Sequence, residues 1–139
     1  MNRRIKKNCG IIDVGCGNLM NKEYRTWHFG IDNDKLVKLV LSGKKTATTC
    51  IYDEGDIPLI NEESILVFSN GRKACITKTK KVIITEFKNI NEEFALLEGE
   101  GDFDFWKNEH IKYFKSIDSN FNQDTKVLFE IFEVSKLFE

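Results

Sequence analysis

The sequence contains no apolar stretch long enough to cross a membrane. It has no run of the 18 or more apolar residues that a membrane-spanning helix needs. Its basic start, which includes Arg3, Arg4, Lys6 and Lys7, is followed by only a few apolar residues, broken by Asp13 and by glycines. We therefore expect neither a spanning helix nor a signal peptide, and a cytoplasmic protein without a membrane partner.

Paired metal ligands are also missing. The metal-binding residue types besides the carboxylates are Cys9, Cys16, Cys50, Cys75, His28 and His110. No two of the cysteines form a Cys-x-x-Cys pair, and the two histidines are far apart in the sequence. A structural zinc site needs closer ligand spacing, so we expect reduced thiols, no bound metal and no cofactor.

The sequence lacks a strong net charge, because 21 basic and 22 acidic side chains leave a formal charge of −1. This balance argues against generic binding of polyanions. The charge is nevertheless uneven, since residues 72–81 hold five basic and no acidic side chains and residues 92–104 hold six acidic and no basic ones. Two interpretations stay open: two solvated faces, or a basic groove beside an acidic catalytic or regulatory loop.

An Asp-x-Gly-x-Gly motif at residues 13–17 follows an apolar pair, as in many sites for nucleotide cofactors such as S-adenosylmethionine. Such a site needs a helix after the glycines and βαβ repeats beyond it. Residues 18–30 show no helical stripe, and no βαβ repeats follow. We therefore interpret residues 1–23 as an N-terminal extension that is dispensable for folding, and residues 24–139 as the domain.

Periodicity predicts three helices. The first begins at Asp32 or Asn33 and ends before Gly43. Asn91 is placed to cap a short second helix that runs through residue 97. Asp102 is placed to cap a third, whose apolar stripe consists of Phe103, Trp106, His110, Tyr113 or Phe114, and Ile117. A histidine on such a stripe is more often packed than catalytic.

Strands are predicted at residues 46–52, 64–68, 73–80, 81–87 and 126–134, which are rich in β-branched and apolar residues. The pair Asn70-Gly71 is a strong signal for a hairpin between the second and third of these strands. Short strands interrupted by two or three helices predict an α+β domain, built on a small, strongly bent sheet or barrel.

Several motifs occur in a specific order: WHFG at 27–30, LVLSGKKTATT at 39–49, FALLEGEGDFDFWKNEH at 94–110 and VLFEIFEV at 127–134. Together they resemble the ASCH-domain family, which is related to the PUA domains, over residues 24–134. The resemblance implies a PUA-like small β-barrel of about five to six strands with flanking helices. It also implies a cleft lined by the Gly-Lys-Lys-Thr-Ala-Thr loop.

The resemblance implies a role in binding RNA or a modified nucleoside, and a small bacterial relative hydrolyses N4-acetylcytidine. Matched motif by motif, the catalytic lysine, threonine and glutamate of that amidohydrolase fall on Lys45, Thr48 and Glu98. A threonine hydroxyl needs a base to take its proton, and a lysine desolvated in a cleft can serve as one. A neighbouring glutamate could orient that lysine, although its charge would also make the lysine a weaker proton acceptor.

We expect the partner to be a nucleoside or a short single-stranded RNA. The candidate substrate-binding residues are Trp27, Phe29, Lys44, Thr46, Glu100, Arg72 and Lys78. The two aromatic residues could stack on a base or belong to the core. The acidic loop could hold a divalent cation, but a turn that caps the following helix is favoured. A non-catalytic binding module and a metal-dependent ribonuclease therefore stay open as alternatives to the amidohydrolase.

Overall fold

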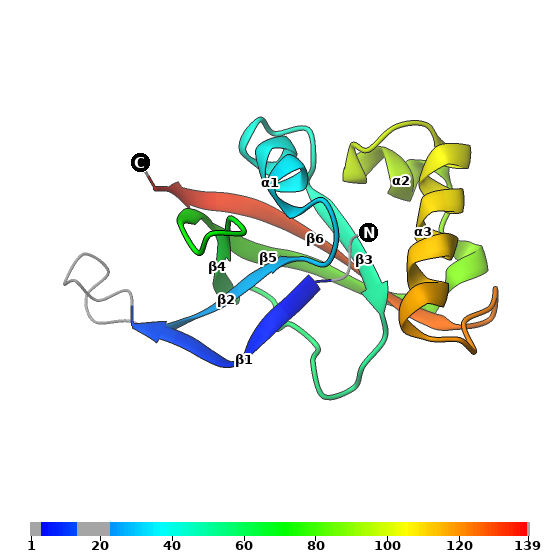
Figure 1. Cartoon of the computed structure of the whole chain (residues 1–139), viewed down its shortest axis with the longest axis horizontal. Coiled ribbons are helices and arrows are strands. Elements are labelled where there is room, and N and C mark those ends of the chain that lie inside the picture. Colours follow the sequence, from blue (N-terminus) through cyan, green and yellow to red (C-terminus); the bar gives the residue numbers. More distant parts are fainter. Residues whose placement is uncertain (1–3, 14–22, 139) are drawn as a thin grey trace.

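The structure is a computed structural model that describes residues 4–13 and 23–138. Its elements in chain order are β1 (Arg4–Asp13), β2 (Glu23–Phe29), α1 (Asn33–Leu41), β3 (Ala47–Ile51), β4 (Glu63–Val67), β5 (Lys73–Glu86), α2 (Glu92–Glu98), α3 (Phe103–Ile117) and β6 (Lys126–Leu137) (Figure 1). The glycines of the Asp-x-Gly-x-Gly motif lie outside the described residues. The α+β class predicted from the sequence is confirmed.

The described strands form one mixed sheet in the order β1-β2-β4-β5-β6-β3. β2 and β4 run parallel, and the other neighbouring strands are antiparallel. The expected barrel is wrong, because β1 and β3 are the two edges and no ladder joins them within residues 4–13 and 23–138. Closure depends on strand stagger and tilt, which periodicity in a sequence does not reveal.

The predicted strands are present with one difference, and β1 and β2 are strands that the sequence did not predict. The Asn70-Gly71 turn joins β4 to β5 as expected, with Gly71 at φ 88°. Residues 73–86 form one long strand instead of two, and its pairing with β6 shifts register twice. These irregularities bend the strand, so one element pairs with β4 through its first half and with β6 along most of its length.

The helices begin at the predicted residues. Asn91 and Asp102 accept hydrogen bonds through their side chains from the backbone N–H groups of Phe94 and Phe105, and so cap α2 and α3. Asp32 precedes α1, but it adopts a left-handed conformation and makes no capping hydrogen bond through its side chain. Among the residues that the structure describes, no helix is long and apolar enough to span a membrane.

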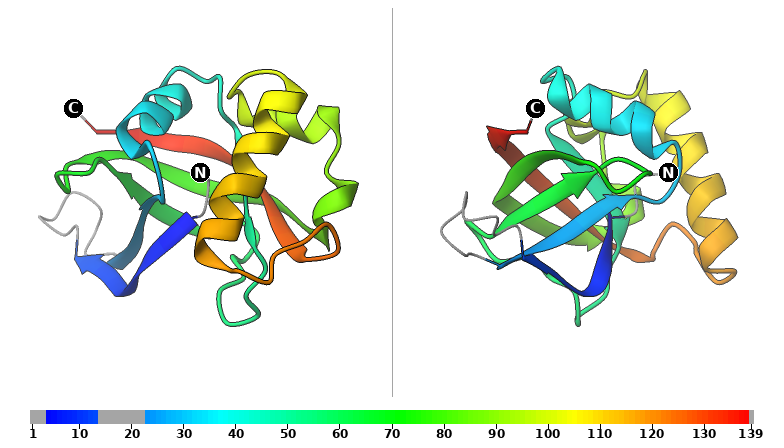
Figure 2. Two further views of the ribbon diagram at one scale, coloured as in Figure 1. Left: turned by 45° about the vertical axis from the view of Figure 1, so that its right-hand side comes forward. Right: turned by 60° about the vertical axis from the view of Figure 1, so that its left-hand side comes forward.

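Two apolar clusters attach the helices to the sheet. α1 packs through Leu36, Val37 and Val40 against a cluster that contains Trp27 and Phe29. The α2–α3 pair packs through a second cluster, whose buried members are Ala47, Phe87, Ile90, Ala95, Trp106, Phe114, Phe121, Val127 and Phe129. The α2–α3 pair lies beside α1, as Figures 1 and 2 show.

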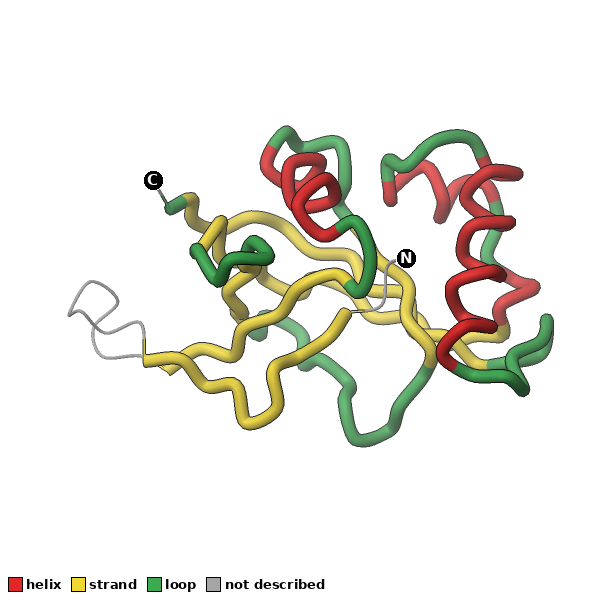
Figure 3. The backbone as a smooth tube through the Cα atoms, viewed as in Figure 1, coloured by secondary structure: helices red, strands yellow, loops and turns green. Residues whose placement is uncertain are grey.

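Residues 4–13 pair with β2 as an antiparallel edge strand whose register breaks between Lys6 and Ile11. This pairing joins part of the expected N-terminal extension to the sheet. Its dispensability for folding stays a prediction, which thermal unfolding of a chain that starts at Met20 would check. Residues 52–62 connect the edge strand β3 to β4, which lies next to β2, without a helix or strand (Figure 3).

Candidate functional site

Lys45 lies in the tight connection between α1 and β3. The chain reverses after α1 through Gly43, which has φ 82°, and the backbone N–H groups of Lys44 and Lys45 both donate to the Leu39 carbonyl oxygen. A left-handed residue is the usual end of a helix, and glycine adopts that conformation without a steric penalty. The turn directs the Lys45 side chain into the protein, where it is fully buried.

The turn after α2 packs directly on this connection. Gly99 has φ 67°, and a Cβ atom added there would lie 2.2 Å from the Lys44 carbonyl oxygen. Next to this contact, Thr46 donates its backbone N–H to the Leu97 carbonyl oxygen at 2.8 Å. Only glycine permits this approach, which brings the residues on either side of Gly99 to Lys45.

Lys45, Thr49, Glu98, Glu100 and His110 form a buried polar cluster, which we call the charge cluster. The Lys45 ammonium lies 3.1 Å from Glu98 Oε1 and 2.5 Å from Glu100 Oε2. Glu98 Oε2 accepts a hydrogen bond of 2.5 Å from the Thr49 hydroxyl. The side chains of Lys45 and Glu98 are 0% exposed and that of Glu100 is 4% exposed, so these charges interact with little screening by water.

The two carboxyl groups differ in their pKa. Burial by itself would raise the pKa of Glu98, but the Lys45 ammonium and the neighbouring His110 and Thr49 outweigh it and lower the pKa to about 2. Burial raises the pKa of Glu100, and the charge of Glu98 adds to this effect against the attraction of Lys45. Glu98 is therefore the fixed negative partner of Lys45, whereas Glu100 is the carboxyl group that takes a proton more readily.

His110 closes the cluster from α3. Its Nδ1 lies 2.7 Å from the Trp106 carbonyl oxygen, which only accepts, so Nδ1 carries a proton. Its Nε2 faces Glu98 Oε1 at 3.7 Å. The ring stacks on Trp106 with 4.1 Å between centroids. A packed histidine was expected, but its contact with Glu98 was not, because the turn at residues 99–102 sets where α3 lies and the spacing does not give the path of that turn.

Of the predicted catalytic residues, the structure brings Lys45 and Glu98 together but places Thr48 apart from them. Successive side chains of a strand alternate between its faces. Thr49 contacts Glu98, so Thr48 lies on the opposite face of β3, where it is paired in register with the buried Glu130. The threonine in the charge cluster is the one that the sequence analysis did not select.

Of the seven candidate substrate-binding residues, only Glu100 belongs to the charge cluster. Trp27 and Phe29 are in the core at 0% and 1% exposure, although the Phe29 ring lies 5.3 Å from Lys45 Nζ. Their burial leaves no open ring face for a base. Thr46 contacts the Leu97 carbonyl oxygen through its hydroxyl at 3.3 Å and its backbone N–H.

The remaining candidates are basic residues elsewhere on the molecule. Lys44 is exposed beside Lys45. Arg72 lies at the hairpin, with its guanidinium 4.3 Å from the centroid of the Phe68 ring. Lys78 is half-buried on β5, in register with Glu63 of β4. These three cations therefore come from separate elements.

A pocket of about 240 Å³ lies between α1 and the start of α3, and we call it the α1–α3 pocket. Its lining residues are Asp32, Lys35, Leu36, Leu39, Gly99, Glu100, Phe105 and Glu109. The pocket reaches the charge cluster through Glu100, whose Oε2 contacts Lys45. Its other oxygen, Oε1, is buried and accepts no hydrogen bond from residues 4–13 or 23–138. A buried acceptor without a donor is costly, and a ligand with an N–H group could supply one.

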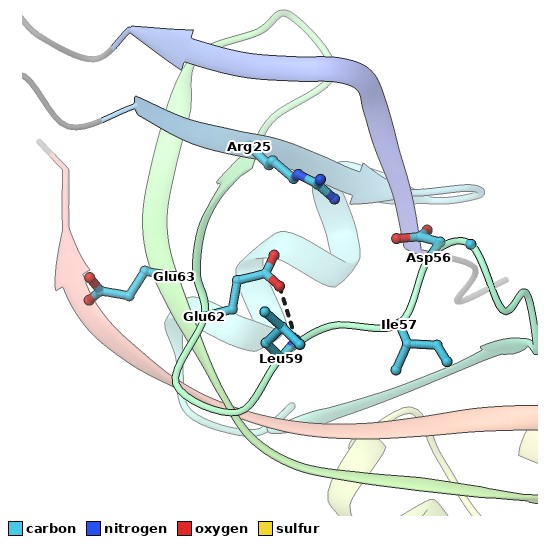
Figure 4. A pocket seen from close by; sticks show the side chains of 7 residues that line it. Arg25, Asp56, Ile57, Leu59, Glu62 and Glu63 are labelled. Carbon is cyan, nitrogen blue, oxygen red and sulfur yellow. Dashed lines mark hydrogen bonds between the residues drawn. The ribbon is translucent and has the colours of Figure 1, made fainter.

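Two other pockets lie elsewhere on the molecule, and the first of them borders two predicted residues. A mainly apolar pocket of about 410 Å³ is bordered by Lys45 and Thr46 together with the C-terminal end of α1 and the second half of β6. A pocket of about 480 Å³ lies between β2 and the connection from β3 to β4, where Glu62 accepts a hydrogen bond from the backbone of Leu59 (Figure 4). Neither contains a second residue of the charge cluster.

Glu98, Glu100 and His110 could together hold a metal ion, since their ligand atoms lie within 4.8 Å of one another. In the structure, however, the Lys45 ammonium contacts both carboxylates. A cation at this place would compete with that ammonium for the same oxygens. The residues therefore fit a metal poorly as long as Lys45 is in the cluster.

Comparisons with known proteins agree with the motifs. The model of the ASCH domain family matches residues 25–136. The structure is similar to an ASCH domain from Lactobacillus crispatus, with a TM-score of 0.74 and 22% identity over 80% of this chain and 79% of that one. It is also similar to a protein from Enterococcus faecalis assigned to the family DUF984, with a TM-score of 0.67 and 30% identity over 75% of this chain and 72% of that one. No curated protein matches the sequence significantly. The family model spans most of the chain, and the chain therefore belongs to the ASCH domain family.

Proposed function

We propose that this domain binds a nucleoside, free or as part of a short single-stranded RNA, in the α1–α3 pocket. The observation that carries the proposal is the Oε1 atom of Glu100, a buried acceptor without a hydrogen-bond donor at the edge of a pocket. Binding of RNA is often proposed for ASCH domains, which is consistent with a nucleoside as the ligand. The net charge of −1 favours a small ligand over an extended RNA footprint.

The residues around the pocket suit a nucleobase. A carboxylate is a natural acceptor for the exocyclic amino group of cytosine. The ring of Phe105 is 48% exposed and lines the same pocket, so it offers a face on which a base can stack. The Lys45 ammonium bridges the carboxylates of Glu98 and Glu100, and this contact holds Glu100 in place. Recognition then combines one aromatic face with one fixed acceptor.

A second candidate function is hydrolysis of an N4-acyl group on a cytidine. It is favoured by the short hydrogen bond from the Thr49 hydroxyl to Glu98, beside the Lys45 ammonium. In this function Glu98 would take the proton of the Thr49 hydroxyl as that hydroxyl attacks the acyl carbon, and would return the proton to N4 of cytidine as the C–N bond breaks. Water would then hydrolyse the acyl ester on Thr49, and Lys45 would stabilise the negative charge that develops on the acyl oxygen in both steps. The site is closed in this structure, so hydrolysis would require α1 and the α2–α3 turn to separate.

Calorimetric titration with cytidine tests the binding proposal. Wild type should bind cytidine, and Glu100→Ala should weaken binding at least about tenfold, because a donor on the base loses its charged acceptor. Glu92→Ala serves as the control, since Glu92 is an exposed acid on α2 that does not line the pocket. Absence of binding to cytidine, adenosine and short single-stranded RNA would contradict the proposal.

An assay with N4-acetylcytidine separates the two candidates and the two threonines. If the domain is a hydrolase that uses the charge cluster, Lys45→Ala, Glu98→Gln and Thr49→Ala each abolish turnover. If the family resemblance gives the correct nucleophile, Thr48→Ala abolishes turnover and Thr49→Ala only reduces it. Binding without turnover by wild type would leave the domain a non-catalytic binding module.

A further inference from the structure

The α1–α3 pocket carries acidic side chains at its rim. Asp32 comes from the residue before α1 and Glu109 from the middle of α3, and both line the pocket. Lys35 is the single basic residue among the lining residues. Within the part of the chain that the structure describes, neither acid forms an ion pair. The rim therefore has an excess of negative charge around the buried acceptor of Glu100.

Asp32 is unusual in its backbone as well. It has φ 52° and occupies the position before α1, yet its side chain does not cap the helix. An aspartate in a left-handed conformation is costlier than a glycine, and such outliers are often kept for a functional reason. Its carboxylate is exposed and available to act on whatever enters the pocket.

We propose that Asp32 and Glu109 make the pocket selective for uncharged nucleosides over nucleotides that carry a phosphate. This inference rests on the proposed function, and it names the ligand class for the same pocket. A phosphate attached to a bound nucleoside would lie near the rim, where two carboxylates repel it and one ammonium attracts it. A neutral ribose meets no such repulsion and can donate its hydroxyl groups to the same carboxylates. The selectivity is against charge, so of the two ligands in the proposed function it favours the free nucleoside over a nucleotide of a short RNA.

Titration of wild type with cytidine and with cytidine 5′-monophosphate tests the inference. At pH 7.5 and low salt, we expect cytidine to bind about fivefold more tightly than its monophosphate, a preference of about 1 kcal/mol. The preference should shrink as salt is added, because the rim charges are exposed and are screened by ions. Glucose is a suitable blank ligand, since it is neutral and carries no base.

Variants assign the selectivity to residues. The double variant with Asp32→Asn and Glu109→Gln should bind the monophosphate about as tightly as cytidine, so that the ratio of the two dissociation constants falls from about five to about one. Lys35→Gln should widen the preference for cytidine. Asp104→Asn is the matched control, because Asp104 is an exposed acid on α3 that does not line the pocket.

The outcomes separate this inference from the proposed function. If cytidine and its monophosphate bind equally, or the monophosphate binds more tightly, the inference is overturned while the proposed function stands. A preference for cytidine that survives in the double variant also overturns the inference, because the rim acids are then not its cause. If short single-stranded RNA binds and free nucleosides do not, the inference is overturned; if neither binds, the proposed function fails and the inference fails with it.

Discussion

The Thr49 hydroxyl donates a hydrogen bond of 2.5 Å to Glu98 Oε2, so β3 and the end of α2 are joined inside the protein. Thr48, one residue earlier, faces the other side of β3 and is in register with Glu130. A shift of one residue along a strand reverses the face of a side chain. The two threonines are therefore in different environments although they are neighbours in the sequence. We expect the hydrogen bond to Glu98 to depend on Thr49 and not on Thr48.

Thr49→Val should lower the free energy of unfolding by about 2 kcal/mol, because it removes a donor from a buried carboxylate while it keeps the shape of the side chain. Thr49→Ser should retain most of the stability, since the hydroxyl is kept. Denaturation in urea measures both. Equal stability of Thr49→Val and wild type would show that the hydrogen bond is not important for folding.

Glu98→Gln should destabilise the fold by about 3 kcal/mol at pH 7, because it breaks the buried ion pair with Lys45 and leaves Glu100 as the remaining carboxylate in contact with that ammonium. The folded-state pKa of Glu98, about 2, is below its ordinary value of 4.5. Its ionised form therefore stabilises the fold above about pH 4.5, and this contribution is lost as the pH falls toward 2. The difference in stability between wild type and variant should shrink over that range. A difference that does not depend on pH would contradict the assignment.

For Glu100 the expected dependence of stability on pH is the opposite of that for Glu98. The pKa of Glu100 is raised in the folded protein, so the stability that it contributes is present at low pH and is lost as the pH rises through its folded pKa. A glutamine has no such loss and still accepts a hydrogen bond from Lys45. Thermal unfolding at pH 7.5 should show a variant as stable as wild type or more stable, by up to about 1 kcal/mol. A clear loss of stability at that pH would show that the charge of Glu100 is needed.

Gly99→Ala should cost at least about 2 kcal/mol, because the new Cβ would lie 2.2 Å from the Lys44 carbonyl oxygen and the residue has φ 67°. Gly43→Ala is the matched control. Gly43 has φ 82°, but an added Cβ there meets nothing within 4 Å, so only the conformational cost of about 1 kcal/mol applies. Similar losses for the two variants would mean that the close approach at Gly99 is unimportant.

Metal binding should depend on Lys45. Wild type should unfold at the same temperature with and without a chelator, because the lysine ammonium already contacts both carboxylates. Lys45→Ala should be less stable, and it should gain stability from added Zn²⁺ or Mn²⁺, since Glu98, Glu100 and His110 then have no competing cation. The double variant with Lys45→Ala and His110→Ala is the control and should gain less. Stabilisation of wild type by Mn²⁺ would instead favour the metal-dependent ribonuclease.

The helices and most of the strands were predictable from the sequence. Asn91 and Asp102 mark the starts of α2 and α3, and Asn70-Gly71 marks the hairpin, because caps and tight turns depend on a few neighbouring residues. The motifs also identified Lys45 and Glu98, which the structure places 3.1 Å apart. The caps and the hairpin turn depend on a few neighbouring residues, and Lys45 and Glu98 were identified through the family resemblance, so all of them can be predicted from one sequence.

The contacts between side chains from distant segments could not be predicted from the sequence, because they depend on the tertiary structure. The open sheet follows from how the edge strands β1 and β3 are placed in space, and local periodicity contains no record of that placement. Trp27 and Phe29 were read as either stacking or core residues, and packing against α1 buries them. Thr49 and His110 join Glu98 because the close approach at Gly99 and the stripe of α3 bring three elements together. Contacts between distant segments depend on the summed packing of the whole domain, and that is why the sequence named the lysine and glutamate but not their full surroundings.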